Sequence, residues 1–188
     1  MRARAPRWRA PAWAAACTEV GSLADLLAAG EQQTLEFFVA RLQEVSEAPV
    51  DHQELLYNAS VLAHHARVST QSASDLTTPA TLAEVFDHFV IDASLRDDSA
   101  MMEAAGAQCL LLAGFFEDQL RRRHNIRWYA RLGAGFFSRA ADLERSPQKV
   151  RLFGAIAAGF EPWRQRHARL SRQLREQSYL LRPQRPPT

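Results

Sequence analysis

Apolar residues recur at helical spacing along nearly the whole of this 188-residue chain, and this periodicity constrains the fold more than any other feature. The spacing predicts one helix between Gly30 and Pro49 and a second that Asp51 caps, with Glu54 completing a capping-box-like start. No stretch of the sequence shows the sustained alternation of a half-buried strand. We therefore predict an all-α fold, a single-domain bundle of six or seven helices.

The stretch from Ala104 to Phe116 is apolar on nearly all sides. A helix of this kind is most simply the central helix of a bundle, and Asp97, Asp98 or Ser99 is expected to cap its start. The stretch is shorter than the ~18 apolar residues that a membrane span needs. Because it is the closest candidate, the sequence predicts no membrane span.

Other helices are marked by caps, prolines and breaks. Thr78-Pro79 predicts the start of a helix, and residues 121–125 break the chain before a helix that ends near Ser146-Pro147, where Ser146 is expected to cap the next one. Pro162 is expected to kink or break the chain before the last helix. Glycine within helices indicates close crossings; those glycines are Gly106, Gly114, Gly133, Gly135, Gly154 and Gly159.

Composition divides the chain into a flexible basic arm (1–20), a helical domain (21–182) and a disordered tail (183–188). The arm is basic like a secretion signal, but Pro11 interrupts the apolar segment that such a signal requires. Cys17 and Cys109 form no Cys-x-x-Cys or Cys/His ligand spacing, and Cys109 is expected to pack in the core. We expect a cytoplasmic protein.

The net charge of +2 conceals a division along the chain. Residues 21–104 hold three arginines against fourteen acidic residues, a net −11, whereas residues 105–188 hold sixteen basic residues against six acidic ones, a net +10. Two explanations are open. The two halves pack together and complement each other, or the basic half faces an acidic partner such as a nucleic acid.

Two groups of arginines are candidate contact residues. Arginine donates paired hydrogen bonds to phosphate and stacks on bases, so each group suits a phosphate-bearing partner as well as a protein. The first group combines cations with an aromatic ring and also suits the negative end of a helix dipole: Arg121, Arg122, Arg123, Arg127, Trp128 and Arg131. The second surrounds an apolar stripe that begins at Trp163 and His167: Arg164, Arg166, Arg169, Arg172 and Arg175.

No catalytic constellation accompanies these groups. Glu84 and His88 stand four residues apart, and with His64 from the preceding helix they are the best candidates for a metal site. The Glu-x-x-His pattern of di-iron bundles is absent from the chain, and a half-buried histidine beside a carboxylate explains the same residues. The sequence therefore predicts no metal, no cofactor and no catalytic residue.

The stretch Ala107–Phe116, continued through Arg121–Arg123 to Trp128–Gly133, resembles a segment of small uncharacterised bacterial helical proteins. The resemblance covers about thirty residues, from 105 to 135, and involves core-type positions. It implies a helical fold and a bacterial source, and it implies no activity.

Three functional hypotheses follow. The leading one is a non-enzymatic protein that binds another macromolecule, most simply a protein, through the basic amphipathic C-terminal helix from Trp163 to Leu181. The alternative is nucleic-acid binding through the arginine clusters, and the third is a metal- or cofactor-dependent helical enzyme using His64, Glu84 and His88. The sequence leaves homo-oligomerisation open.

Overall fold

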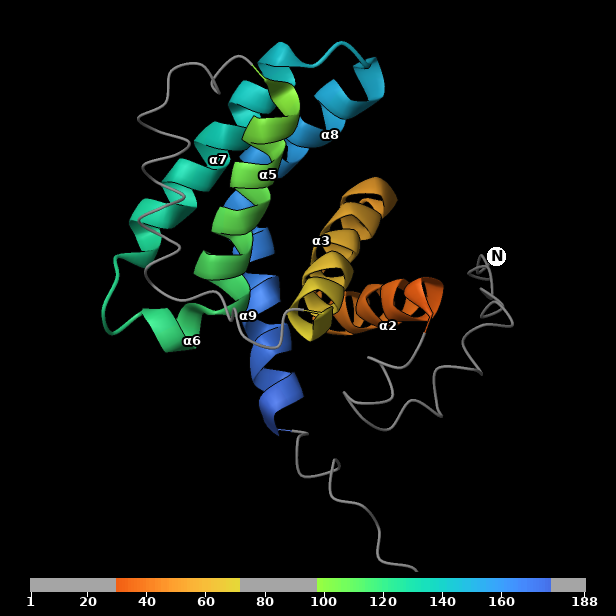
Figure 1. Ribbon diagram of the computed structural model, residues 1–188, viewed down its shortest axis with the longest axis vertical. Helices are drawn as coiled ribbons and strands as arrows, with labels where there is room; N and C mark the ends of the chain where they lie inside the picture. The colour runs from red at the N-terminus through yellow and green to blue at the C-terminus, as the bar shows by residue number, and fades with distance from the viewer. Residues whose placement is uncertain (1–29, 72–97, 177–188) are drawn as a thin grey trace, which may run out of the picture.

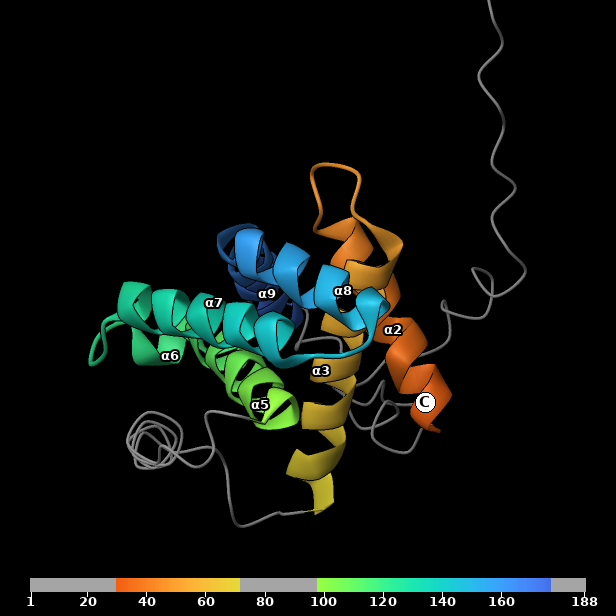
Figure 2. The ribbon, with the colours of Figure 1, turned by 90° about the horizontal axis from the view of Figure 1, so that it is seen from above.

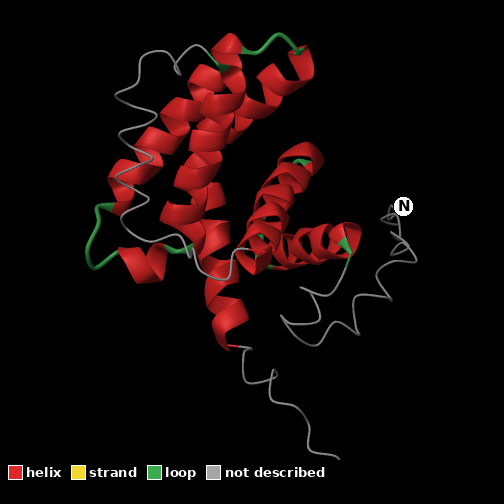
Figure 3. Ribbon diagram, viewed as in Figure 1, coloured by secondary structure: helices red, strands yellow, loops and turns green. Residues whose placement is uncertain are grey.

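The protein is all-α, as the periodicity predicts, in a computed structural model that describes residues 30–71 and 98–176. These residues form seven α-helices and one π-helical turn and contain no strand (Figure 3). The elements are α2 (Glu31–Glu44), α3 (His52–Gln71), α5 (Ser99–Leu110), η4 (Leu111–Phe115), α6 (Glu117–Leu120), α7 (Ile126–Leu143), α8 (Pro147–Ala158) and α9 (Phe160–Glu176). The helix expected after Thr78-Pro79, the arm 1–20 and the tail 183–188 lie outside the described residues.

The helices pack as two groups joined by α9 (Figures 1 and 2). α2 packs on α3 in one group, and α5 packs on α7 in the other, with α8 against the far end of α7. α9 contacts helices of both groups, including α2 and α7, and packs most closely on η4. Within the described part of the chain, no helix is long and apolar enough to cross a membrane.

Side-chain caps define three helix starts, and two of them are positions that the sequence marks. The Asp51 carboxylate accepts hydrogen bonds from the N–H groups of Gln53 and Glu54, at 2.9 and 3.1 Å, and Asp98 is the cap of α5. Asn125 caps α7 by accepting from the Trp128 N–H. These contacts satisfy backbone donors that a helix start leaves without an internal partner.

Two expected helix features differ in the structure. Ser146 occupies the N-cap position of α8, but its side chain forms no cap hydrogen bond; its own N–H donates to the Glu144 carboxylate at 3.0 Å. The break before the last helix falls at Gly159, where α8 has ended, and Pro162 lies in the first turn of α9. A first-turn N–H has no helical partner to lose, so proline fits there without a kink.

The apolar stretch 104–116 forms the end of α5 and all of η4, between α7 and α9. Its glycines permit close crossings at specific points. A Cβ on Gly114 would lie 2.9 Å from the Arg164 carbonyl oxygen, and one on Gly133 would overlap the Phe160 ring. The same expectation is wrong for Gly135 and Gly154, where a Cβ would meet nothing within 4 Å.

The apolar stripe of α9 is part of the core. Trp163, His167 and Leu170 are each no more than 1% exposed. Two polar contacts join this stripe to α3 at matched four-residue intervals: Trp163 Nε1 donates to Glu54 Oε2 at 2.6 Å, and His167 Nε2 lies 3.1 Å from Asn58 Oδ1. Glu54 therefore donates its N–H to the cap of α3 and accepts a hydrogen bond from an indole on α9 with its carboxylate.

Candidate functional site

The arginines of α9 are largely occupied within the fold. The Arg164 guanidinium lies 3.0 Å from a Glu117 oxygen and 2.7 Å from a Glu161 oxygen, and it also donates to the Ala113 carbonyl at 3.2 Å. Its side chain is only 13% exposed. The bidentate contact with Glu161 lowers the pKa of that carboxyl group, since the charged form is stabilised by the guanidinium.

The other α9 arginines meet acidic residues from several elements. Arg175 and Arg172 lie 2.5 and 3.8 Å from oxygens of Asp118 on α6, and Arg169 lies 2.6 Å from Glu47 in the loop after α2. Among these α9 contacts with described residues, the Arg169–Glu47 pair joins the acidic half of the chain to the basic half. Most of the ion pairs of the α9 arginines with described residues therefore use acidic residues of the same, basic half of the chain.

Arg166 stacks on an aromatic ring instead of forming an ion pair. Its guanidinium carbon lies 4.7 Å from the centre of the Trp163 ring. Burial, and then the neighbouring positive charge of Arg169, lower the pKa of Arg166, although the guanidinium stays charged at neutral pH. Each of the five predicted α9 arginines thus has a partner inside the protein.

The first predicted group forms a surface that we call the α6–α7 corner: Arg121, Arg122, Arg123, Arg127 and Arg131. All five residues are exposed. The Arg121 guanidinium lies 3.7 Å from an Asp118 oxygen, and its side chain is 59% exposed. An ion pair this exposed contributes little to the stability of the fold. The other four have no acidic side chain of the described residues within ion-pair distance.

The helix dipole does not account for this corner. Arg127 lies in the first turn of α7, at the positive end of that helix, where a cation is unfavourable. Arg121–Arg123 follow α6, which is only four residues long. The explanation that these cations offset the negative end of a helix dipole therefore fails for Arg127 and has little support for the others.

Aromatic rings adjoin the corner. Trp128 and Tyr129 are half-buried and meet edge to face, with ring centres 4.9 Å apart, and the His124 ring lies 6.2 Å from that of Tyr129. The apolar face of α7 points away from this surface, because Ala130 and Phe137 are buried in the core. The corner therefore presents cations and ring edges without an exposed apolar helix face.

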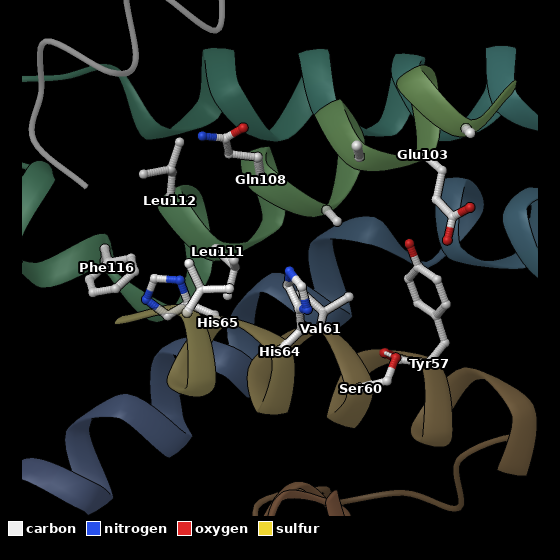
Figure 4. A pocket seen from close by; sticks show the side chains of 14 residues that line it. Tyr57, Ser60, Val61, His64, His65, Glu103, Gln108, Leu111, Leu112 and Phe116 are labelled. Carbon is white, nitrogen blue, oxygen red and sulfur yellow. Dashed lines mark hydrogen bonds between the residues drawn. The ribbon is translucent and has the colours of Figure 1, made fainter. Parts of the chain in front are cut away.

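A pocket of about 560 Å³ lies between α3 on one side and α5 with η4 on the other (Figure 4). Most of its wall is apolar. The lining residues are Tyr57, Ser60, Val61, His64, His65, Val68, Ala100, Glu103, Ala104, Ala107, Gln108, Leu111, Leu112 and Phe116. Glu103 is the only Asp, Glu, Lys or Arg among them.

Tyr57 and Glu103 lie at one end of this pocket and His65 lies toward the other, with His64 between them (Figure 4). At one end the Tyr57 hydroxyl points toward the Glu103 carboxylate, and burial, followed by the charge of Glu103, raises the pKa of Tyr57. At the other end the His65 ring meets Phe116 edge to face, with centres 5.2 Å apart. Burial and the neighbouring His64 lower the pKa of His65, so its imidazole is neutral at pH 7.

The candidate metal residues are not brought together in the described structure. His64 lines the pocket, while Glu84 and His88 lie outside the described residues. Across residues 30–71 and 98–176, no three histidine, cysteine or acidic side chains are placed to hold a metal ion. Cys109 is 1% exposed and burial raises its pKa to about 12, which makes it a core thiol as expected.

Sequence reasoning overlooked Tyr57 and Glu103. A signal for Glu103 was present, because it is the only charged residue between Ser99 and Phe116 in a mostly apolar stretch. The sequence contains no such signal for Tyr57, because this residue occupies an ordinary core-facing position. A scan against protein-family models and searches of curated proteins and of solved structures found no match to the chain.

Proposed function

We propose that this chain is a non-enzymatic nucleic-acid-binding protein and that the α6–α7 corner is its contact surface. The observation that supports this choice is the contrast between the two arginine groups. The arginines of α9 have acidic or aromatic partners within the fold, whereas Arg122, Arg123, Arg127 and Arg131 are exposed without an acidic partner in the described structure. Exposed cations with no acidic side chain of the described residues within ion-pair distance are available to neutralise phosphates.

The chemistry of the corner favours nucleic acid over an anionic lipid surface. Interfacial helices insert an exposed apolar face beside their cations, and α7 buries its apolar face in the core. Arginine together with half-buried tryptophan and tyrosine rings suits phosphate contacts and edge or stacking contacts with bases. The leading sequence hypothesis, a protein partner on α9, has less support because the arginines of that helix are engaged.

The test is fluorescence anisotropy with a labelled single-stranded oligonucleotide and the full-length chain, between about 50 and 300 mM NaCl. The logarithm of the association constant should fall linearly with the logarithm of salt, by about 0.7 for each phosphate contact. Replacing Arg122, Arg123 and Arg127 together with glutamine should reduce the magnitude of that slope by about 2 and weaken binding at every salt concentration.

A matched control removes the same charge elsewhere. Arg145, Lys149 and Arg151 are exposed around the start of α8, and their triple glutamine variant has the same net charge as the corner variant. Equal losses in the two variants would mean that net charge alone drives binding. That result, or the absence of binding at low salt, or tighter binding to anionic vesicles than to the oligonucleotide, would overturn the proposal.

A further inference from the structure

We propose that the pocket between α3 and α5 binds a small amphipathic amine, with its cationic group at Glu103 and its apolar body against the wall formed by η4. This site is separate from the α6–α7 corner and is independent of nucleic-acid binding. Its volume of about 560 Å³ lies within the range of about 300 to 1,000 Å³ that small-molecule pockets occupy.

The sign of the ligand charge follows from Glu103. Within the described structure no arginine, lysine or histidine pairs with this half-buried carboxylate, and its described polar neighbour is the Tyr57 hydroxyl. A half-buried carboxylate in an apolar wall is stabilised by a cation that enters with a ligand. An anionic ligand would be repelled by the negative charge of Glu103.

The position of the Tyr57 ring adds to the preference for a cation. The ring is fixed from behind by edge-to-face contacts with Phe137 and Phe153, at 5.8 and 6.1 Å between ring centres. Its hydroxyl end therefore reaches the pocket from a rigid support. The hydroxyl oxygen at that end can accept a hydrogen bond from an ammonium group placed beside Glu103.

The apolar body has a defined place in the same pocket. Leu111, Leu112 and Phe116 lie toward the end away from Glu103, and Val61 lies between the two ends (Figure 4). The neutral His65 ring at that end stands edge to face with Phe116 and adds no positive charge to repel the ligand at pH 7. A flat aromatic body with an amine on a short chain matches this division between a charged end and an apolar end.

Three indole compounds test the charge requirement with one ring system. Tryptamine carries an ammonium group, tryptophol a hydroxyl and indole-3-acetate a carboxylate. Titration of the isotope-labelled full-length chain, followed by amide chemical shifts near pH 7, should show tryptamine binding with shifts confined to α3, α5 and η4. Tryptophol should bind at least about tenfold more weakly, and indole-3-acetate should not bind, because a charge-assisted contact is lost or reversed.

Two variants with matched controls test the location. Glu103→Gln should weaken tryptamine binding at least about tenfold, while Asp142→Asn, which removes an exposed charge on α7, should leave it unchanged. Ala104→Trp should block the pocket for all three compounds, whereas Ala158→Trp at the exposed end of α8 should not. If Ala104→Trp fails to fold, the Glu103→Gln comparison still decides.

Specific results would overturn the inference. Equal affinity for the amine and the carboxylate would show that Glu103 does not select the ligand. Chemical shifts that map to α8 or the α6–α7 corner would place the binding elsewhere. Tryptamine binding that survives both Glu103→Gln and Ala104→Trp would exclude this pocket as the site, and no binding by any of the three compounds would contradict the proposed ligand class.

Discussion

Acidification from pH 7 to pH 5 should lower the free energy of unfolding by about 2 kcal/mol through a single side chain, His167. The imidazole is fully buried on α9, and its Nε2 lies 3.1 Å from Asn58 Oδ1. Its Nδ1 is buried without a hydrogen-bond partner. Since the amide oxygen can only accept, Nε2 carries the proton, and Nδ1 has no anion nearby that would stabilise a second one.

The magnitude follows from the shift in protonation between the folded and unfolded states. Burial lowers the pKa of His167 from 6.5 to about 3, so the folded protein keeps the ring neutral while the unfolded chain takes up a proton below pH 6.5. The stability contribution is therefore present above pH 6.5 and is lost as the pH falls toward 3. The loss approaches about 1.4 kcal/mol for each pH unit, which gives about 2 kcal/mol by pH 5.

Urea unfolding at several pH values between 7 and 5 measures this loss, with His167→Gln as the comparison. Glutamine is uncharged throughout the range and can donate to Asn58. His65 also has a pKa lowered by burial, and it contributes equally in both proteins. The lowered pKa of Glu161 affects stability only below about pH 4.5. The difference between the two proteins therefore isolates His167.

An equal loss of stability in the wild type and in His167→Gln would show that His167 is not the source. A ring resonance of His167 that titrates near pH 6.5 in the native protein would contradict its burial directly. The expected spectrum shows that ring unprotonated as long as the protein stays folded.

Three further changes test the packing. Gly114→Ala should destabilise the protein by about 1 to 3 kcal/mol, because the new Cβ would clash with the α9 backbone. Gly135→Ala, on the open face of α7, should stabilise it by up to about 1 kcal/mol. Thermal unfolding of the two variants measures both effects. Trp163→Phe should cost at least about 1.5 kcal/mol in urea unfolding, since it removes a hydrogen bond to a carboxylate, and an unchanged midpoint would contradict this. In a Cys17→Ser background, Cys109 should react with a thiol reagent only as fast as the protein unfolds, and rapid native labelling would contradict its burial.

Local signals in the sequence predicted the helices well, because helix starts depend on neighbouring residues. Asp51 caps the helix that it was expected to cap, and Asp98 is the cap among the three candidates that the sequence offered for α5. Ser146 stands at the N-cap position that its place in the sequence marks, but its side chain forms no cap hydrogen bond, and its own N–H donates to Glu144. Pro162 does not break the chain as expected, because it lies in the first turn of α9. The spacing of apolar residues alone does not show whether a proline precedes a helix or lies in its first turn.

The sites were less predictable than the helices. The ten predicted arginines and one tryptophan form two local groups in the sequence, yet the availability of the arginines depends on acidic residues far along the chain. Arg169 meets Glu47 across 122 residues, and Arg175 meets Asp118 across 57. No spacing rule connects such pairs, so sequence composition could not distinguish the paired arginines of α9 from the exposed arginines of the α6–α7 corner.

The sequence by itself determined that this chain is helical, where most helices begin and which faces are apolar, because these properties arise from residues within a turn or two of one another. Only the tertiary structure decided that α9 is a core helix whose arginines are engaged, that Glu103 faces a pocket, and that His167 is held neutral. Burial, ion pairing and desolvation depend on the distances between segments that the chain brings together only when it folds.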